Sequence, residues 1–176
     1  GDALPFSDIE GLGIGTDWQD EIFSTAFMTN HNVGISGGSE KINYYLGASN
    51  LKQDGIISPE KSNFVRNNVR FTLGVDLSDK FRLTTTTNYT TFDTKTLSDN
   101  GLGSVLFNAL NYSPTFSVDQ EDEDGFLGNE VINPLSQIRD TYNERLGNNI
   151  EGIITLDYKP TKNIKVTTRL GYKSFN

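Results

Sequence analysis

The sequence contains no cysteine, and it has one histidine, one tryptophan and one methionine among 176 residues. Without cysteine, a disulfide framework, a thiolate zinc site and a cysteine nucleophile are all excluded. The single histidine, His31, leaves no material for a multi-histidine metal site or a Ser-His-Asp triad. No apolar run approaches the ~20 residues of a membrane-spanning helix. The sequence therefore predicts a protein that is not an enzyme and has no cofactor.

The chain also has few basic residues, with 15 Lys and Arg against 23 Asp and Glu and a net charge of −8. Nucleic-acid binding is excluded, because phosphate contacts need clustered Lys and Arg. The mean hydropathy of −0.45 suits a soluble protein or a membrane β-barrel, in which only every second strand residue faces lipid. The chain begins at Gly1 without a signal peptide and ends within a strand-like run, so we expect a piece of a longer protein.

Residues 64–77 show the clearest alternation of apolar and polar side chains. The apolar positions are Val65, Val69, Phe71, Leu73, Val75 and Leu77, interrupted by Asn67, and the alternate positions include Arg66, Arg70 and Asp76. A period of two predicts a β-strand with one dry and one wet face. Comparable patterns predict further strands over 27–37, 42–52, 81–93, 148–159 and 164–175.

The lengths of the connections between these strands alternate. Those at 38–41, 78–80 and 159–163 are short, whereas those at 53–63 and 94–147 are long. Up-and-down outer-membrane barrels place short turns on the periplasmic side and long loops outside. The order predicts an all-β, antiparallel up-and-down meander of about six long strands, part of a large transmembrane β-barrel.

Charge placement and strand length also favour a membrane barrel. The charged residues of the third, fifth and sixth strands all fall on the polar face, and a lipid-facing Lys or Arg at mid-bilayer costs about 2–4 kcal/mol. Strands of this length exceed the ~5–6 residues usual in soluble proteins. Two alternatives remain: a soluble, secreted β-sandwich binding module, and a complete eight-stranded barrel that would need two further strands.

The long loop 94–147 contains two segments with helical spacing. Residues 104–110 place Val105, Leu106, Ala109 and Leu110 at helical intervals. Pro134 is suited to the first position of a second short helix, which carries Leu135, Ile138 and Tyr142 on one side. We therefore expect short helices within this loop, on either side of the acidic run 119–125.

Several short motifs recur together in one protein family. The motifs are TDWQDEIF at 16–23, SGGSEKINYYLGAS at 36–49, QDGII at 53–57, LFNALNYSPTFSV at 106–118, the acidic DG at 124–125 and NPL at 133–135. In this order and spacing they resemble the SusC/RagA-type TonB-dependent transporters of the Gram-negative outer membrane. The resemblance covers the chain from about Thr16 to its end.

The resemblance implies a barrel of about 22 strands behind an N-terminal plug domain. Residues 1–25 would then lead in from the plug region, 26–176 would be the N-terminal part of the multi-pass outer-membrane barrel, and 94–147 would be an extracellular loop. It further implies import of a glycan or peptide with a SusD-like surface lipoprotein, driven by TonB-ExbB-ExbD. The plug and the TonB box have no counterpart in these residues.

The extracellular loop supplies the candidate ligand-binding residues. They are the aromatic residues Phe107, Tyr112, Phe116 and Phe126 and the acidic residues Asp122 and Asp124. The aromatic rings could stack on sugar rings or could hold a long loop together as its own small core. Asp122 and Asp124 resemble part of an EF-hand Ca²⁺ loop, but Gln120 and Val131 occupy two positions at which that loop has acidic ligands. A solvated acidic loop is the alternative, and we predict no metal site.

Overall fold

The structure is a computed structural model that describes residues 13–98, 101–119 and 131–176. The chain divides into two compact units. The sheet unit comprises residues 27–54, 63–94 and 144–176. The loop unit comprises the chain up to residue 26 together with 55–62 and 95–143.

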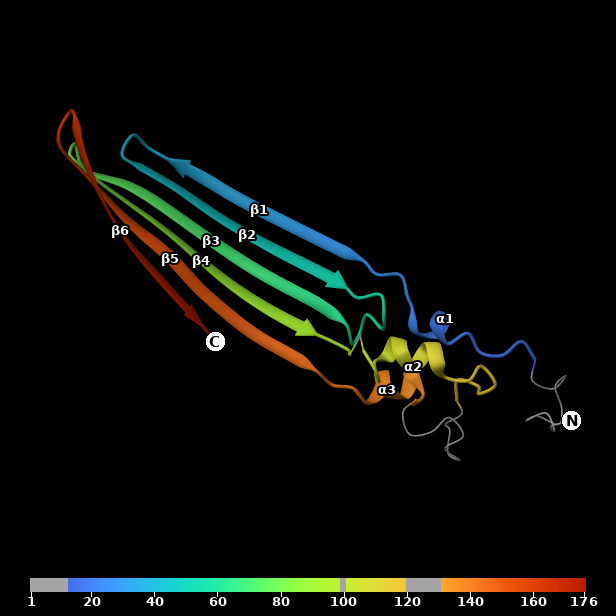
Figure 1. Cartoon of the computed structure of the whole chain (residues 1–176). Helices are drawn as coiled ribbons and strands as arrows, with labels where there is room; N and C mark the ends of the chain where they lie inside the picture. Colours follow the sequence, from blue (N-terminus) through green and yellow to red (C-terminus); the bar gives the residue numbers. More distant parts are fainter. Residues whose placement is uncertain (1–12, 99–100, 120–130) are drawn as a thin grey trace, which may run out of the picture. The chain divides into compact units, whose positions relative to one another are not determined.

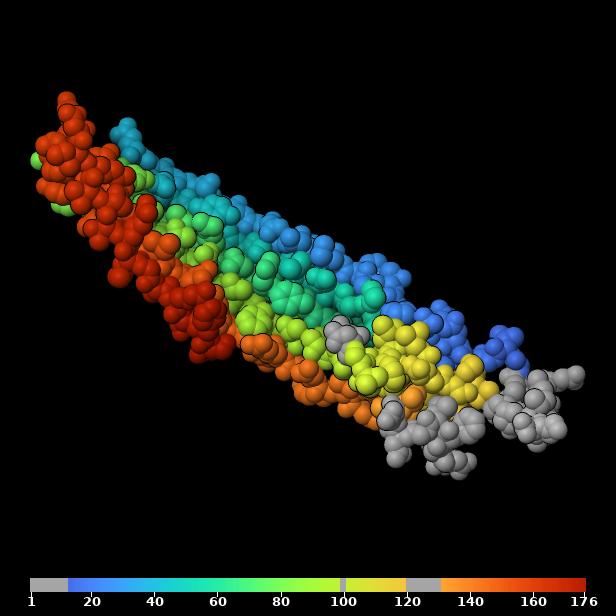
Figure 2. All heavy atoms as spheres, in the orientation of Figure 1, coloured from blue at the N-terminus to red at the C-terminus, as the bar shows by residue number. Residues whose placement is uncertain are grey.

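The sheet unit is a single antiparallel meander of six strands that lie side by side in chain order (Figure 1). The strands are β1 Met28–Gly38, β2 Ile42–Asp54, β3 Asn63–Ser78, β4 Phe81–Lys95, β5 Glu144–Thr161 and β6 Ile164–Phe175. Figure 2 shows the same order as the colours pass across the sheet from blue to red. The predicted meander of six long strands is confirmed. The sandwich alternative needs two facing sheets, and the described residues form one.

The register brings apolar residues of neighbouring strands into common rows. Ile35 of β1 lies opposite Leu46 of β2, which lies opposite Phe71 of β3. These side chains are 60%, 45% and 39% exposed within the described chain. An apolar face this wide is rare on the surface of a soluble monomer. One face of the sheet unit therefore requires an apolar environment.

A row of polar residues limits this apolar face in the first strands. His31 lies opposite Asn50, and Asn50 lies opposite Asn67. The Asn50 Nδ2 donates to the Asn67 Oδ1 at 2.7 Å, and the Asn67 Nδ2 donates to the Thr91 Oγ1 at 3.4 Å. Asn67, which interrupts the apolar alternation in the sequence, is thus aligned with the polar residues of its neighbours.

A tyrosine on the apolar face connects three strands. Tyr172 of β6 lies opposite Gly152 of β5, and its hydroxyl is 2.7 Å from the Thr87 Oγ1 of β4. A Cβ atom at position 152 would lie 2.5 Å from the tyrosine ring. Only glycine at position 152 lets the ring cross β5 to reach β4.

The strand β5 is longer than the sequence indicates. It begins at Glu144 rather than at residue 148 and continues through Thr161, so the last turn is confined to residues 162–163. Near its start, the Asn148 backbone exchanges both hydrogen bonds with Asn176 at 3.0 Å. The strand passes Pro160 because the pairing is irregular between Tyr158 and Thr161, where a residue without an N–H is tolerated.

The loop unit contains three short helices: α1 Trp18–Ile22, α2 Val105–Asn111 and α3 Pro134–Asp140. The expected helices in the long loop are confirmed, but α3 ends at Asp140, so Tyr142, which was expected on its apolar side, lies beyond the helix and is exposed. The helix α1 was not expected. Asp17 caps α1 by accepting hydrogen bonds from the Gln19 and Asp20 amides, and Asn133 caps α3 with Pro134 at its first position. Within the described ranges, no helix has the length and apolar character to cross a membrane.

Candidate functional site

The loop unit has its own apolar core, built from three separate stretches of the chain. The buried members are Trp18, Ile22, Ile57, Leu97, Val105, Ala109, Tyr112 and Ile138. They come from the segment before β1, from the connection between β2 and β3 and from the long connection between β4 and β5. Packing across such sequence distances makes these segments one folded body.

Trp18 connects the segment before β1 to the long loop through a hydrogen bond and a ring contact. Its Nε1 donates to the Ser113 carbonyl at 3.0 Å, and its ring meets the Tyr112 ring edge-on, with centroids 5.0 Å apart. Two residues earlier, the Thr16 Oγ1 donates to the Phe116 carbonyl at 2.7 Å. The described part of the predicted lead-in is thus a structural component of the loop unit.

A buried amide connects the two helices of the long loop. Asn108 is 1% exposed, and its Nδ2 donates to the Gln137 Oε1 of α3 at 2.7 Å. The Asn108 Oδ1 accepts from the Ile132 amide at 3.4 Å, and the Gln137 Nε2 donates to the Gly103 carbonyl at 2.7 Å. Buried polar groups satisfied in this way fix one arrangement of the surrounding chain.

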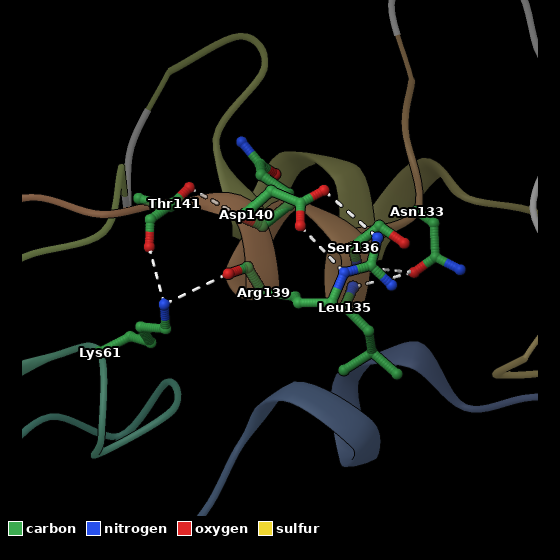
Figure 3. Close-up of polar contacts among 8 residues, drawn as sticks. Lys61, Asn133, Leu135, Ser136, Arg139, Asp140 and Thr141 are labelled. Carbon is green, nitrogen blue, oxygen red and sulfur yellow. Dashed lines mark hydrogen bonds and ion pairs between the residues drawn. The ribbon is translucent and has the colours of Figure 1, made fainter.

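Lys61 connects the β2–β3 connection to the end of α3 (Figure 3). Its Nζ donates to the Arg139 carbonyl at 3.2 Å and to the Thr141 carbonyl at 3.0 Å. The last carbonyls of a helix have no partners within the helix and attract positive charge. Lys61 therefore satisfies the carboxyl end of α3 from a segment 78 residues away in sequence.

A neighbouring ion pair lies at the same helix end. The Arg139 Nε donates to the Asp140 Oδ1 at 2.9 Å, and this hydrogen bond lowers the pKa of the Asp140 carboxyl. A carboxylate with a lowered pKa stabilises the folded state above its unfolded pKa, and this stabilisation is lost as the pH falls through the folded value. Both side chains are about two-thirds exposed, so the pair contributes little to stability.

Replacing Lys61 with methionine should loosen α3. The substitution keeps most of the apolar stem but leaves two carbonyls without the ammonium, at a cost of about 1–3 kcal/mol. We expect faster hydrogen exchange at the amides of residues 137–141 and unchanged exchange within β1–β3. Lys80→Met removes the same charge from an exposed turn and should change neither the exchange of residues 137–141 nor that within β1–β3. Equal protection of residues 137–141 in Lys61→Met and in the unsubstituted protein would contradict the role given to Lys61.

The predicted ligand-binding residues lie in different surroundings. Tyr112 is 3% exposed and sits in the core, where Phe116 tilts against it at 5.4 Å between centroids, so both rings contribute to loop packing. Phe107 is half-buried on α2. Asp122, Asp124 and Phe126 lie outside the described residues. Ligand contact by this set stays a prediction, and so does the choice between a Ca²⁺ site and a solvated loop for the two aspartates.

The described ranges contain no group of three or more His, Asp or Glu side chains that could hold a metal ion.

The polar face of the sheet unit carries a hollow of about 760 Å³ that the sequence did not indicate. It is lined by residues of β3, β4, β5 and β6, among them Arg70, Thr84, Thr86, Glu151, Thr155 and Arg169. All six occupy the alternate, polar positions of their strands. The alternation marked these positions as polar, but only the register brings them together.

Comparisons with known proteins agree on one family. No protein-family model matches the chain. The TonB-dependent receptor P26 of Formosa agariphila is 30% identical over 167 residues, which is 92% of this chain. The TonB-dependent receptor SusC of Bacteroides thetaiotaomicron is 40% identical over 82 residues, 46% of this chain. A structure of the RagAB peptide transporter superposes on 90% of the chain with a TM-score of 0.71 at 16% identity, a likeness of fold.

The two receptors and the RagAB chain are all much longer than this chain. The matched regions span 16% of P26, 7% of SusC and 19% of the RagAB chain. The long meander with a helical loop unit is therefore similar to one stretch of a larger receptor or transporter.

Proposed function

Because this chain belongs to the SusC/RagA-type TonB-dependent receptors, we propose that its six strands form part of the wall of an outer-membrane β-barrel that imports a nutrient. The role is transport rather than catalysis. The nutrient is a glycan or a peptide, and uptake is coupled to TonB-ExbB-ExbD through parts of the protein outside this chain. The structural neighbour RagAB is a peptide transporter, which supports the peptide alternative.

The observation that carries this proposal is the exposed apolar face of the sheet unit. Rows such as Ile35, Leu46 and Phe71 need an apolar surrounding, and lipid provides it. In a bilayer every backbone polar group must be paired, which a closed barrel achieves. The polar row of His31, Asn50 and Asn67 then marks the depth at which the outer face leaves the hydrocarbon.

The loop unit belongs on the extracellular side in this proposal. Outer-membrane barrels expose long loops to the outside, and the loop 94–147 would contact substrate or a SusD-like surface lipoprotein. Residues 26–176 are the N-terminal part of the barrel, and residues 1–25 lead in from the plug region. Thr16 and Trp18 pack within the same loop unit, which supports placing the described end of this lead-in outside the cell as well.

Cysteine labelling of the full-length protein in intact cells tests the orientation. This stretch contains no cysteine, so a cysteine introduced at Leu102, which is 89% exposed in the loop unit, or at Lys162 in a short turn adds a labelling site that the unsubstituted full-length protein lacks. We expect a membrane-impermeant maleimide to label position 102 on intact cells and position 162 only after lysis. Labelling of both positions on intact cells, or the reverse order, would contradict the proposal.

A further inference from the structure

We infer that the polar face of the sheet unit carries an anion-binding site centred on Arg70 and Arg169, which takes an oxyanion of the transported oligomer. The inference rests on the proposed function, because it requires that this face line the transport pathway. It goes beyond that function by naming the charge class of the substrate. The ligand chemistry is a carboxylate or sulfate group on a short chain of residues or sugars.

The first argument is that these two arginines form no ion pair with a described residue, whereas three other cations of the same face do. Three cations form ion pairs: Arg82 with Asp76 at 2.9 Å, Lys165 with Asp157 at 3.0 Å and Lys173 with Glu151 at 3.5 Å. Arg70 and Arg169 form no ion pair or side-chain hydrogen bond with any residue in the described ranges. Their guanidinium groups, each with five donors, are available to a ligand.

The strand register explains why they are unpaired. Arg70 of β3 lies opposite Gly47 of β2, and Arg169 of β6 lies opposite Thr155 of β5. Neither opposite position offers a carboxylate. Asp157, two positions beyond Thr155, already accepts a hydrogen bond from the Thr167 Oγ1 at 2.7 Å and is paired with Lys165. The sheet thus sets both arginines opposite neutral cross-strand neighbours.

The second argument is that both arginines line the same hollow. Its volume of about 760 Å³ falls within the range of ligand sites. Between the arginines, Thr84, Thr86 and Asn88 of β4 and Thr155 of β5 contribute hydroxyl and amide groups to the lining. The lining holds three cations, Arg70, Arg169 and Lys173, against the one carboxylate of Glu151. This local excess of positive charge occurs in a chain whose net charge is −8.

The chemistry of the guanidinium group defines the ligand. Its planar fork matches the two oxygens of a carboxylate or sulfate, and such bidentate contacts are shorter and stronger than neutral hydrogen bonds. A positive patch within an acidic surface also concentrates anions and is weakened by salt. Acidic oligosaccharides and acidic peptides share this oxyanion chemistry, while the threonine hydroxyls suit the polar backbone of either.

The test measures binding of paired probes to the purified full-length receptor at low and high salt. One pair is hexagalacturonate and its methyl ester, and the other is a hexaglutamate peptide and its glutamine counterpart. Within each pair only the oxyanions differ. We expect at least one acidic probe to bind the unsubstituted receptor about tenfold more tightly than its neutral counterpart. The pair that shows the preference identifies sugar or peptide as the source of the oxyanion.

Substitution then locates the site. Arg70→Gln combined with Arg169→Gln should abolish the preference for the acidic probe and leave binding of the neutral probe unchanged. Arg66→Gln is the matched control, because Arg66 is a polar-face arginine of the same strand that does not line the hollow. Since Arg70 and Arg169 form no side-chain hydrogen bond or ion pair with a described residue, their replacement removes none within the described ranges.

Three results would overturn the inference: an unsubstituted receptor without a preference for either acidic probe, a double variant that keeps the preference, or an Arg66→Gln variant that loses it equally. Cysteine labelling at positions 102 and 162 is repeated in the double variant. Correct labelling together with an unchanged preference refutes the anion site alone. Incorrect labelling in the unsubstituted protein refutes the barrel orientation.

Discussion

Replacing Ile35 with arginine is expected to destabilise the protein in lipid by about 2–4 kcal/mol, the cost of a cationic side chain on the lipid face of a barrel near mid-bilayer. Ile35 is 60% exposed and lies in the apolar row with Leu46. In urea titrations of the receptor folded into phospholipid vesicles, the unfolding midpoint should fall. The yield of folded barrel should fall with it.

Ser36→Arg is the matched control, since Ser36 is the next residue along β1 and points to the polar face opposite Tyr45. The same arginine there should leave the free energy of unfolding within about 0.5 kcal/mol of that of the unsubstituted protein. If the two variants unfold alike, the assignment of the apolar face to lipid is wrong. A larger loss in Ser36→Arg than in Ile35→Arg would invert the faces of the sheet.

Replacing Trp18 with alanine should cost the loop unit about 3–5 kcal/mol, as expected for a large aromatic residue removed from a core. The tryptophan is 3% exposed, meets the Tyr112 ring edge-on and donates to the Ser113 carbonyl. Hydrogen exchange of the amides in α2 and α3 should accelerate by more than about a hundredfold. The strands of the sheet unit should keep their protection, because none of the buried core residues belongs to a strand.

Two companion variants separate the contributions of Trp18. Trp18→Phe keeps most of the ring but removes the N–H, so a loss of about 1–2 kcal/mol should remain from the Ser113 hydrogen bond. Ile14→Ala truncates a fully exposed apolar residue of the same segment and should change exchange very little. Unchanged protection of α2 in Trp18→Ala would show that the segment before β1 does not support the long loop.

The strands could be predicted from the sequence because their signal is local. In β3 every second residue from Val69 to Leu77 is apolar, and the pleat alone turns them to one face. Since neighbouring strands are joined by turns as short as residues 79–80 between β3 and β4, order and direction follow from the same pattern. The start of β5 at Glu144 escapes the pattern because its polar residues resemble those of a loop.

Beyond the helices α2 and α3, the packing of the loop unit could not be predicted, because its contacts join residues far apart in the chain. Trp18 bonds to a carbonyl 95 residues away, and Lys61 to one 80 residues away. The cap at Asp17 followed by Asp20 and Glu21 was a readable signal for α1. A core role for Tyr112 is one of the two alternatives that the sequence leaves open, and its partner Trp18 can be identified only in three dimensions.

The candidate anion site likewise combines a local signal, the alternation within each strand, with contacts between residues that are far apart in the chain. The sequence assigns Arg70 and Arg169 to the polar faces of their strands, which lie far apart in the chain but are separated in the sheet only by β4 and β5. Which cations find acidic neighbours is a property of register. Arg82 reaches Asp76 across a tight turn, whereas Arg70 faces a glycine.

The contact of Tyr172 with Thr87 across Gly152 bears on how the strands of the sheet unit are aligned. The tyrosine hydroxyl reaches its partner only when β5 is paired both with β4 and with β6. A slip of β5 by one residue would place Glu151 or Ile153 under the ring in place of the glycine, and every side chain of the strand would change face. The contact therefore forms only when all three strands are in register, and a misaligned β5–β6 hairpin lacks it.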